Sequence, residues 1–204
     1  MIKVLLDRYS LELCKSHALG IVEHYSKFSS LGSGSYNHNN VGSNLVGIKS
    51  EMATKIWLGR NGFTNIQCGY EKFTSTPQGD LTVRDWPIEV KGLRPNQWAG
   101  YKRCIPPKQL DKYVQRNAVV IWTTTTGDIK SDAVTLHGWN FATDVHLKGV
   151  PRTTICENVW LENDEDMRLM GTLIATLKRR NAYQTELPLT QITTIEVSAS
   201  PKNK

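Results

Sequence analysis

Two short stretches of alternating apolar and polar residues constrain this chain more than any other feature. Leu81 and Val83 flank Thr82, and Ile88 and Val90 flank Glu89, which is the period-two pattern of half-buried strands. The four residues between them, Arg84-Asp85-Trp86-Pro87, have the composition of a tight turn. The sequence therefore predicts a β-hairpin with one apolar and one polar face.

Three charged residues would gather on the polar face. If residues 84–87 form the turn, Asp80 lies opposite Lys91 and Thr82 lies opposite Glu89. Opposite residues, and residues two apart on one strand, share a face of a sheet, so Asp80, Glu89 and Lys91 would converge. A register slip of one residue would break this arrangement.

Two carboxylates beside an amine suggest a metal site. Mg²⁺ prefers oxygen ligands and takes one or two carboxylates together with several waters. A metal held by Asp80 and Glu89 would also reach a phosphate oxygen, while Lys91 would activate an attacking water and stabilise negative charge. The alternative is a surface hairpin with an ordinary Glu–Lys cross-strand pair.

Asp80 followed by Glu89-Val90-Lys91 resembles the core motif of the PD-(D/E)xK nuclease superfamily, which includes restriction enzymes, homing endonucleases, junction resolvases and recombination exonucleases. The resemblance covers residues 51–122. One departure is Gln78-Gly79, where the family name has Pro just before Asp80, although Gly-Asp is a common variant. The resemblance implies that Asp80, Glu89 and the Val90 carbonyl bind Mg²⁺ and that Lys91 handles the water.

A helix is predicted over residues 45–60, with Ser43 or Asn44 as its N-cap and Asn61-Gly62 after its last turn. Glu51 lies beside the apolar stripe of this helix. Members of the superfamily often place a Glu on the first core helix, pointing at the metal, and the resemblance assigns this role to Glu51. The alternative is a solvated Glu51 paired with Lys55.

A second helix is predicted from Pro106-Pro107 to Arg116, followed by a buried strand over residues 118–124. Gln109 and Tyr113 are four residues apart and share a face of this helix. The pair is similar to an element of the exonuclease branch of the superfamily, where it supports the metal site or the DNA backbone. The alternative is an amphipathic helix whose apolar face, Tyr113 included, packs inward.

Positive charge is concentrated beside the motif. The chain of 204 residues has a formal net charge of +6, and the segment from Lys91 to Arg116 holds seven basic residues against one acidic residue. Such a patch fits a phosphate backbone, although a solvated basic face is the alternative. The predicted nucleic-acid contacts are Arg94, Lys102, Arg103, Lys108, Lys112 and Arg116.

Other classes of site find no support in the sequence. The four cysteines are far apart and form no Cys-x-x-Cys pair, so neither a zinc site nor an iron–sulfur cluster is predicted. No apolar run is long enough to span a membrane, no signal peptide is recognisable, and no phosphate-binding Gly-x-x-x-x-Gly-Lys-Ser/Thr motif occurs. The expectation is a cytoplasmic protein with no membrane contact and no nucleotide cofactor.

The remaining segments complete an α/β organisation. Helices are predicted over residues 11–28 and 163–181, a strand over 133–139, and a Gly/Ser/Asn-rich loop over 29–44. We expect a single nuclease domain over residues 1–186, with a core at about 45–140 and a flexible tail over 187–204.

The sequence thus predicts an α/β fold with a restriction-endonuclease-like core, in which helices flank a central mixed β-sheet. The expected function is a DNA endonuclease of the restriction, homing or junction-resolving type. It would depend on Mg²⁺, with Mn²⁺ able to substitute, and such enzymes commonly act as homodimers. The alternatives are a DNA exonuclease of the same superfamily, supported by Gln109 and Tyr113, and a non-catalytic DNA-binding module.

Overall fold

A six-stranded mixed β-sheet forms the centre of the fold. The computed structural model describes residues 1–26, 40–69, 79–101, 103–153 and 157–184. The strand order in the sheet is β1-β7-β6-β4-β3-β2; β4 and β6 run parallel, and the other neighbours are antiparallel. The strands are β1 (Ile2–Leu5), β2 (Ile66–Cys68), β3 (Leu81–Val83), β4 (Trp86–Leu93), β6 (Val119–Thr124) and β7 (Ala133–Phe141).

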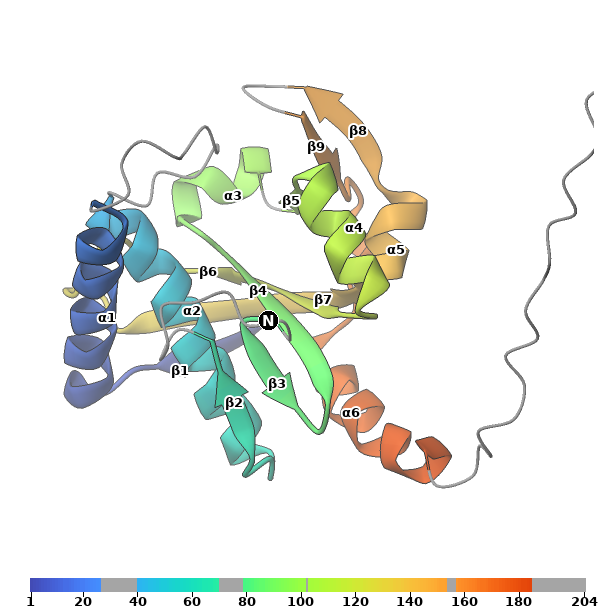
Figure 1. Cartoon of the computed structure of the whole chain (residues 1–204), viewed down its shortest axis with the longest axis horizontal. Helices are drawn as coiled ribbons and strands as arrows, with labels where there is room; N and C mark the ends of the chain where they lie inside the picture. The colour runs from blue at the N-terminus through green and yellow to red at the C-terminus, as the bar shows by residue number, and fades with distance from the viewer. Residues whose placement is uncertain (27–39, 70–78, 102, 154–156, 185–204) are drawn as a thin grey trace, which may run out of the picture.

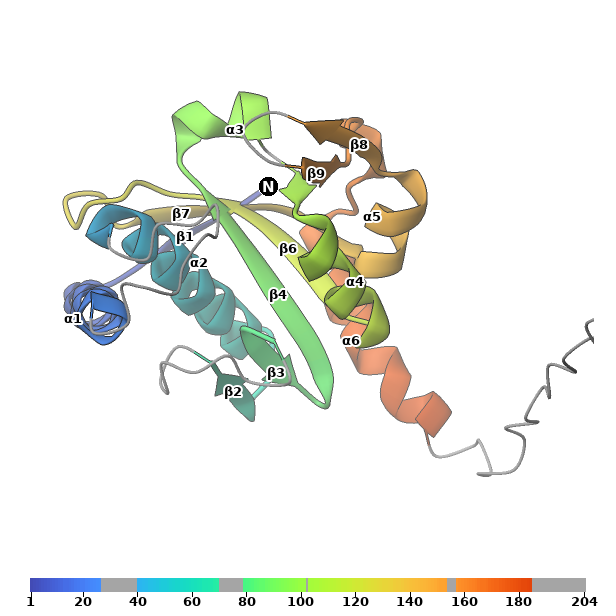
Figure 2. The same ribbon diagram turned by 45° about the horizontal axis from the view of Figure 1, so that its top comes forward.

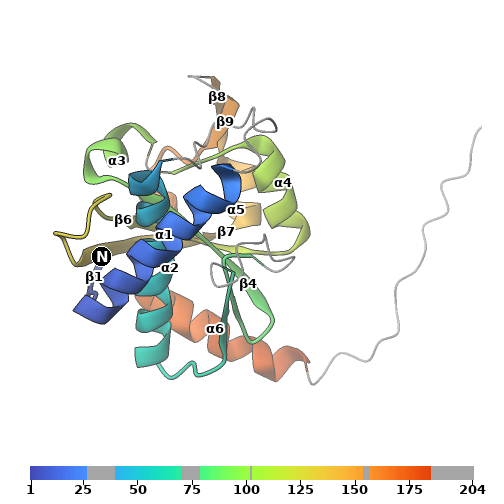
Figure 3. The ribbon, with the colours of Figure 1, turned by 60° about the vertical axis from the view of Figure 1, so that its left-hand side comes forward.

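Helices cover this sheet, which confirms the predicted α/β class (Figure 1). The helices are α1 (Arg8–Ser26), α2 (Val41–Arg60), α3 (Pro95–Tyr101), α4 (Pro107–Gln115), α5 (Ala142–Lys148) and α6 (Met170–Gln184). Helix α1 lies across α2 (Figure 3), whereas α4 and α5 lie on the other side of β4 from α2 (Figure 2). None of the helices in these ranges is long and apolar enough to cross a membrane.

A second, three-stranded sheet lies beside α4 and α5. It consists of β5 (Cys104–Ile105), β9 (Glu157–Trp160) and β8 (Val150–Thr153), in that order. The sequence patterns predicted neither this sheet nor α5, since two- and four-residue strands leave too short a pattern to recognise.

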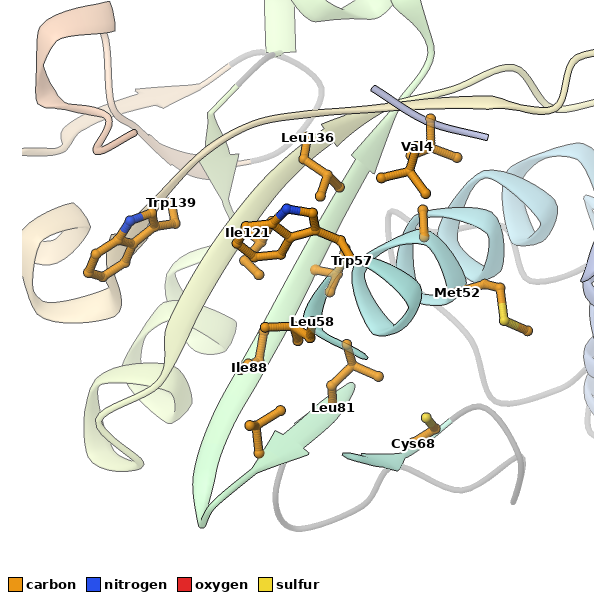
Figure 4. Packing of buried hydrophobic residues seen from close by; sticks show 14 of the residues in the cluster. Val4, Met52, Trp57, Leu58, Cys68, Leu81, Ile88, Ile121, Leu136 and Trp139 are labelled. Carbon is orange, nitrogen blue, oxygen red and sulfur yellow. The ribbon is translucent and has the colours of Figure 1, made fainter. Parts of the chain in front are cut away.

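Two hydrophobic clusters hold the elements together, one on each side of the sheet. The larger joins α1, α2 and α6 to the sheet and includes Trp57, Ile88 and Ile121 (Figure 4). The smaller joins α4 and α5 to the sheet and includes Val120 and Trp122. In the parallel β4–β6 pair Glu89 is aligned with Val120 and Lys91 with Trp122, so these two charged residues face the smaller cluster.

The hairpin forms as predicted, but its turn and register differ from the prediction. The turn is the dipeptide Arg84-Asp85, whose φ angles are +48° and +64°, and Trp86 pairs with Val83. Two left-handed residues match the twist of the flanking strands, and Trp86 gains a buried place in the larger cluster. Thr82 therefore lies opposite Pro87 rather than Glu89, and extending the register by one residue sets Asp80 level with Glu89 rather than Lys91.

The helix of Glu51 begins earlier than predicted. Asn40 caps α2: its Oδ1 accepts a hydrogen bond from the backbone N–H of Ser43 at 2.9 Å, so neither Ser43 nor Asn44 is the cap. The end of the helix agrees with the prediction, because Asn61 is the C-cap and Gly62 follows with φ of +90°.

The predicted helix over residues 163–181 is wrong in its first third. Residues Asp164–Asp166 form one 3₁₀ turn, and α6 begins only at Met170. Between them the backbone of Arg168 exchanges two hydrogen bonds with Trp139 of β7, at 2.9 and 3.0 Å, which holds that segment extended. The predicted tail over 187–204 and most of the loop over 29–44 lie outside the described residues.

Close packing between α2 and β4 depends on Gly92. A Cβ atom at this position would lie 2.5 Å from Ser50 Oγ and 3.0 Å from the Val46 carbonyl oxygen. The Ser50 hydroxyl is fixed there, because it donates to Val46 O at 2.7 Å and accepts from Thr123 Oγ1 at 2.7 Å. The contact therefore sets how close Glu51, the neighbour of Ser50, lies to β4.

Gly92→Ala is expected to lower the free energy of unfolding by about 1–3 kcal/mol through overpacking, as measured by urea denaturation. Ser50→Gly in the same chain should recover part of the loss by removing the nearest atom. Gly47→Ala in α2 is the matched control: a Cβ there meets nothing within 4 Å, so stability should rise by roughly 0.5–1 kcal/mol. Equal stability of Gly92→Ala and wild type would contradict this packing.

Candidate active site

Asp80 is fixed at the start of β3 by the backbone of β4. Its Oδ2 atom accepts a hydrogen bond from the Val90 N–H at 2.7 Å. The residue before it, Gly79, has a φ of +97°, and a Cβ there would lie 3.1 Å from Glu89 Oε1. Glycine is thus the residue that suits this position, both for its left-handed backbone and for the close approach of Glu89.

Glu89 and Lys91 lie on the same face of β4, as the alternation predicted. The apolar partners Ile88 and Val90 point to the opposite face, into the larger cluster. Glu89 is 4% exposed, and Lys91 is half-buried. The prediction that Asp80, Glu89 and Lys91 come together holds in spite of the shifted turn, because a shift of two residues preserves the face.

Glu51 of α2 joins this group. The pKa of its carboxyl is raised well above the ordinary value by burial and then by the negative charges of Asp80 and Glu89, while Lys91 acts in the opposite direction. The influence of both charges on Glu51 requires Asp80 and Glu89 to lie near it. The alternative of a purely solvated Glu51 paired only with Lys55 therefore does not describe its surroundings.

The pKa values of the other two carboxyls are also raised. Burial raises the pKa of Asp80, against the lowering effects of Lys91 and the Val90 N–H. Burial, followed by the charge of Asp80, raises the pKa of Glu89 to about 7, although Lys91, the Tyr113 hydroxyl and Arg116 all favour its ionised form. Burial therefore disfavours the ionised form of all three carboxyls, and neighbouring negative charge adds to this effect for Glu51 and Glu89.

Helix α4 supplies the partners of Lys91. The Lys91 amine donates to the Tyr113 hydroxyl oxygen at 2.7 Å and to Gln109 Oε1 at 3.1 Å. It also lies 4.9 Å from the centre of the Tyr113 ring. Tyr113 is buried and also packs in the smaller cluster. Its ring therefore packs inward, as the alternative interpretation expected, while its hydroxyl accepts the hydrogen bond from Lys91. Gln109 and Tyr113 thus position the Lys91 amine.

The predicted basic patch divides into residues with different surroundings. Lys108 and Lys112 are exposed on α4, and Arg94 is half-buried beside Gly42 and Gly127. The prediction for Arg103 is wrong: it is 1% exposed, and its guanidinium pairs with Asp164 and donates to the carbonyls of Leu161 and Glu162. It therefore joins β5 to the segment after β9. Lys102 lies outside the described residues.

Arg116 lies closer to the carboxylates than its sequence position indicated. It is the C-cap of α4, and its Nη1 atom is 3.8 Å from Glu89 Oε1. Asn117, with a φ of +52°, reverses the chain after the helix and leads directly into β6. No signal in the sequence indicated this contact, because it depends on how α4 packs against β4.

The donor set suits a hard cation such as Mg²⁺. Carboxylate oxygens are its preferred protein ligands, and it usually keeps several waters. No group of three or more His, Cys, Asp or Glu in the described ranges could hold an ion by itself. An ion here would therefore be held by the Asp80–Glu89 pair, with water filling its other coordination positions. The Val90 carbonyl as a further ligand stays a prediction.

The side chains bring together carboxylate oxygens, a positioned amine and a guanidinium. Such a combination is suited to phosphate-ester chemistry, in which negative charge must be neutralised and a water activated. The chain matches no family model, no curated protein and no solved structure.

Proposed function

We propose that this chain is a Mg²⁺-dependent DNA endonuclease with a restriction-endonuclease-like core. The single observation that carries the proposal is the cluster of Glu51, Asp80 and Glu89 beside a positioned Lys91. Burial disfavours the ionised form of all three carboxyls, and neighbouring negative charge adds to this effect for Glu51 and Glu89. Such a group destabilises the fold at neutral pH unless a cation binds beside it. Stability alone would not favour such a group, so we infer that it serves binding and catalysis.

The residues divide the work of phosphodiester hydrolysis among them. Asp80 and Glu89 would hold the cation, and Glu51, which lies beside them, would orient the attacking water. When bound, Mg²⁺ supplies charge neutralisation at the phosphate and lowers the pKa of a coordinated water. Lys91, aligned by Tyr113 and Gln109, holds that water by hydrogen bonding and stabilises the charge that develops on the phosphate. The resemblance to the nuclease superfamily implies products with 5′-phosphate and 3′-hydroxyl ends.

The choice of DNA as substrate rests on charge. The exposed Lys108 and Lys112 project from the helix that also holds Gln109 and Tyr113. A basic surface next to acidic, metal-binding side chains suits a polyanion whose backbone must approach the cation. Binding should therefore weaken steeply as the salt concentration rises.

An exonuclease is the second candidate, and one observation favours it. Both hydrogen bonds of the Lys91 amine go to Gln109 and Tyr113, the two residues that resemble the exonuclease branch. A chain that cuts only from ends and one that cuts internally can share this catalytic geometry. The two enzymes differ in how the DNA strand enters the site. Comparing closed circular DNA with linear DNA tests this difference.

The test compares supercoiled plasmid with the same plasmid linearised, each with and without Mg²⁺. An endonuclease nicks and linearises the closed circle, whereas an exonuclease degrades only the linear form. Asp80→Asn is the matched variant, because it removes the charge but keeps an oxygen for the Val90 N–H. We expect its cleavage rate to fall by at least about 10²-fold.

Two results would refute the endonuclease. Cleavage of the closed circle that persists in EDTA or in Asp80→Asn would mean that the carboxylates are not the reactive centre. Retardation of both DNA forms in a gel without any cleavage in Mg²⁺ or Mn²⁺ would favour a non-catalytic DNA-binding module instead.

A further inference from the structure

The guanidinium of Arg116 has five N–H donors and forms no hydrogen bond to any of the described residues. Within the described residues its one polar contact is the 3.8 Å ion pair with Glu89, a separation too long for a hydrogen bond. The Lys91 amine, by contrast, is bonded to Tyr113 and Gln109, and the guanidinium of Arg103 is bonded to three partners. About a third of the Arg116 side chain is open to solvent.

We infer that Arg116 changes partners as the site fills: it neutralises Glu89 in the free protein and grips a phosphate of the bound strand once a cation has taken that carboxylate. This inference rests on the proposed function and adds a positioning residue to it. Two properties of the site support it. Glu89 can pair with Arg116 or with a metal ion, and a guanidinium matches the fork of two phosphate oxygens better than an ammonium does.

The position of Arg116 makes the exchange sterically possible. The residue caps the carboxyl end of α4, where Asn117 adopts a left-handed conformation and β6 begins. Its backbone is fixed by a hydrogen bond from its own N–H to the Lys112 carbonyl at 3.2 Å. Its side chain reaches Glu89 Oε1 on β4 at 3.8 Å, and the third of it that is open to solvent leaves the guanidinium accessible to a ligand.

Opposite effects on metal and DNA affinity distinguish this role from a structural one. Arg116 competes with a cation for Glu89, so Arg116→Gln should bind Mn²⁺ more tightly by roughly two- to fivefold, a modest gain because the ion pair is loose and partly exposed. The same change should weaken DNA binding by on the order of tenfold, since one charged, forked contact is lost. A residue that only supported the fold would weaken both.

The experiment measures two affinities on the full chain. Mn²⁺ binding without DNA is followed by the paramagnetic resonance signal of the free ion. Binding of a fluorescein-labelled duplex is followed by anisotropy with Mn²⁺ present, in a Lys91→Ala background that does not cut. Arg116→Lys keeps the charge without the fork, and we expect it to bind Mn²⁺ like wild type but DNA less tightly.

Lys130→Gln is the matched control for loss of one positive charge. Lys130 is exposed in the turn after β6, at the opposite end of that strand from Arg116. The inference is overturned if Arg116→Gln behaves like Lys130→Gln in either measurement, or if it weakens Mn²⁺ and DNA together with a fall in thermal stability. A wild-type chain that binds neither Mn²⁺ nor DNA would instead show that the proposed function itself has failed.

Discussion

Lys91→Ala is expected to lower the rate of DNA cleavage by at least about 10³-fold, because it removes the amine that holds the water and stabilises the developing charge. The fold should survive, since the side chain is half-buried and its partners Gln109 and Tyr113 remain packed on α4. DNA binding should change little, because the exposed lysines of α4 are unaffected. Single-turnover cleavage, anisotropy and circular dichroism measure the three properties.

Gln109→Ala provides the graded comparison. It removes the longer of the two hydrogen bonds of Lys91 and leaves the 2.7 Å bond to Tyr113 intact. The amine stays charged and in place, so we expect a loss in rate of only about tenfold, equivalent to about 1.4 kcal/mol in the barrier. If Lys91→Ala cleaved DNA as fast as wild type, Lys91 would have no catalytic role.

The second large effect concerns stability and pH. The pKa of Glu89 is about 7 in the folded protein against 4.5 ordinarily, so between these values the folded state binds the proton more tightly than the unfolded state does. Its contribution to stability is complete below pH 4.5 and is lost as the pH rises to about 7. Glu89→Gln cannot ionise, and it should gain roughly 2–3 kcal/mol over wild type between pH 4.5 and pH 8.

Both proteins must be measured because the protonation of His137 changes stability over the same pH range, in the opposite direction to Glu89. Burial lowers the pKa of His137 to about 4, so the stability it contributes is complete above its ordinary pKa of 6.5 and is lost as the pH falls towards 4. This contribution is common to wild type and Glu89→Gln and cancels in their difference. Urea unfolding at each pH gives the two curves.

Removal of metal should act on the same carboxylates. At pH 8, Mg²⁺ is expected to stabilise wild type by mass action, and wild type should be least stable in EDTA. The stability of Glu89→Gln should change little with either addition. A difference between the two proteins that does not vary with pH would mean that Glu89 titrates normally and that the carboxylates do not crowd one another.

Much of the candidate site could be predicted from sequence, because it depends on which face of a strand or helix each side chain occupies and not on the exact pairing of residues between strands. Alternation placed Glu89 and Lys91 on one side of a strand, and helical spacing placed Gln109 next to Tyr113. An error of two residues in the turn changed which residues face each other but not which face they share. Glu51 was assigned to the site only by the resemblance to the nuclease superfamily, since its place on the helix also allowed a solvated side chain.

The features that the sequence did not predict arise from contacts between distant segments. Arg103 is in a run of basic residues, yet pairing with the carbonyls of Leu161 and Glu162 buries it, and no local pattern encodes that. The start of α6 is delayed because Arg168 pairs with Trp139 of β7 instead of continuing a helix. In both places tertiary hydrogen bonds override local propensity.

The pairing of β1 with β7 has a consequence for how the chain is made. Leu5 is aligned with Ala133, so the first strand has no sheet neighbour until most of the chain has been synthesised. Helices α1 and α2, which lie across each other, can meet long before that. During translation β1 could therefore pack against α2 early, whereas its backbone hydrogen bonds would have to wait until β7 has emerged from the ribosome.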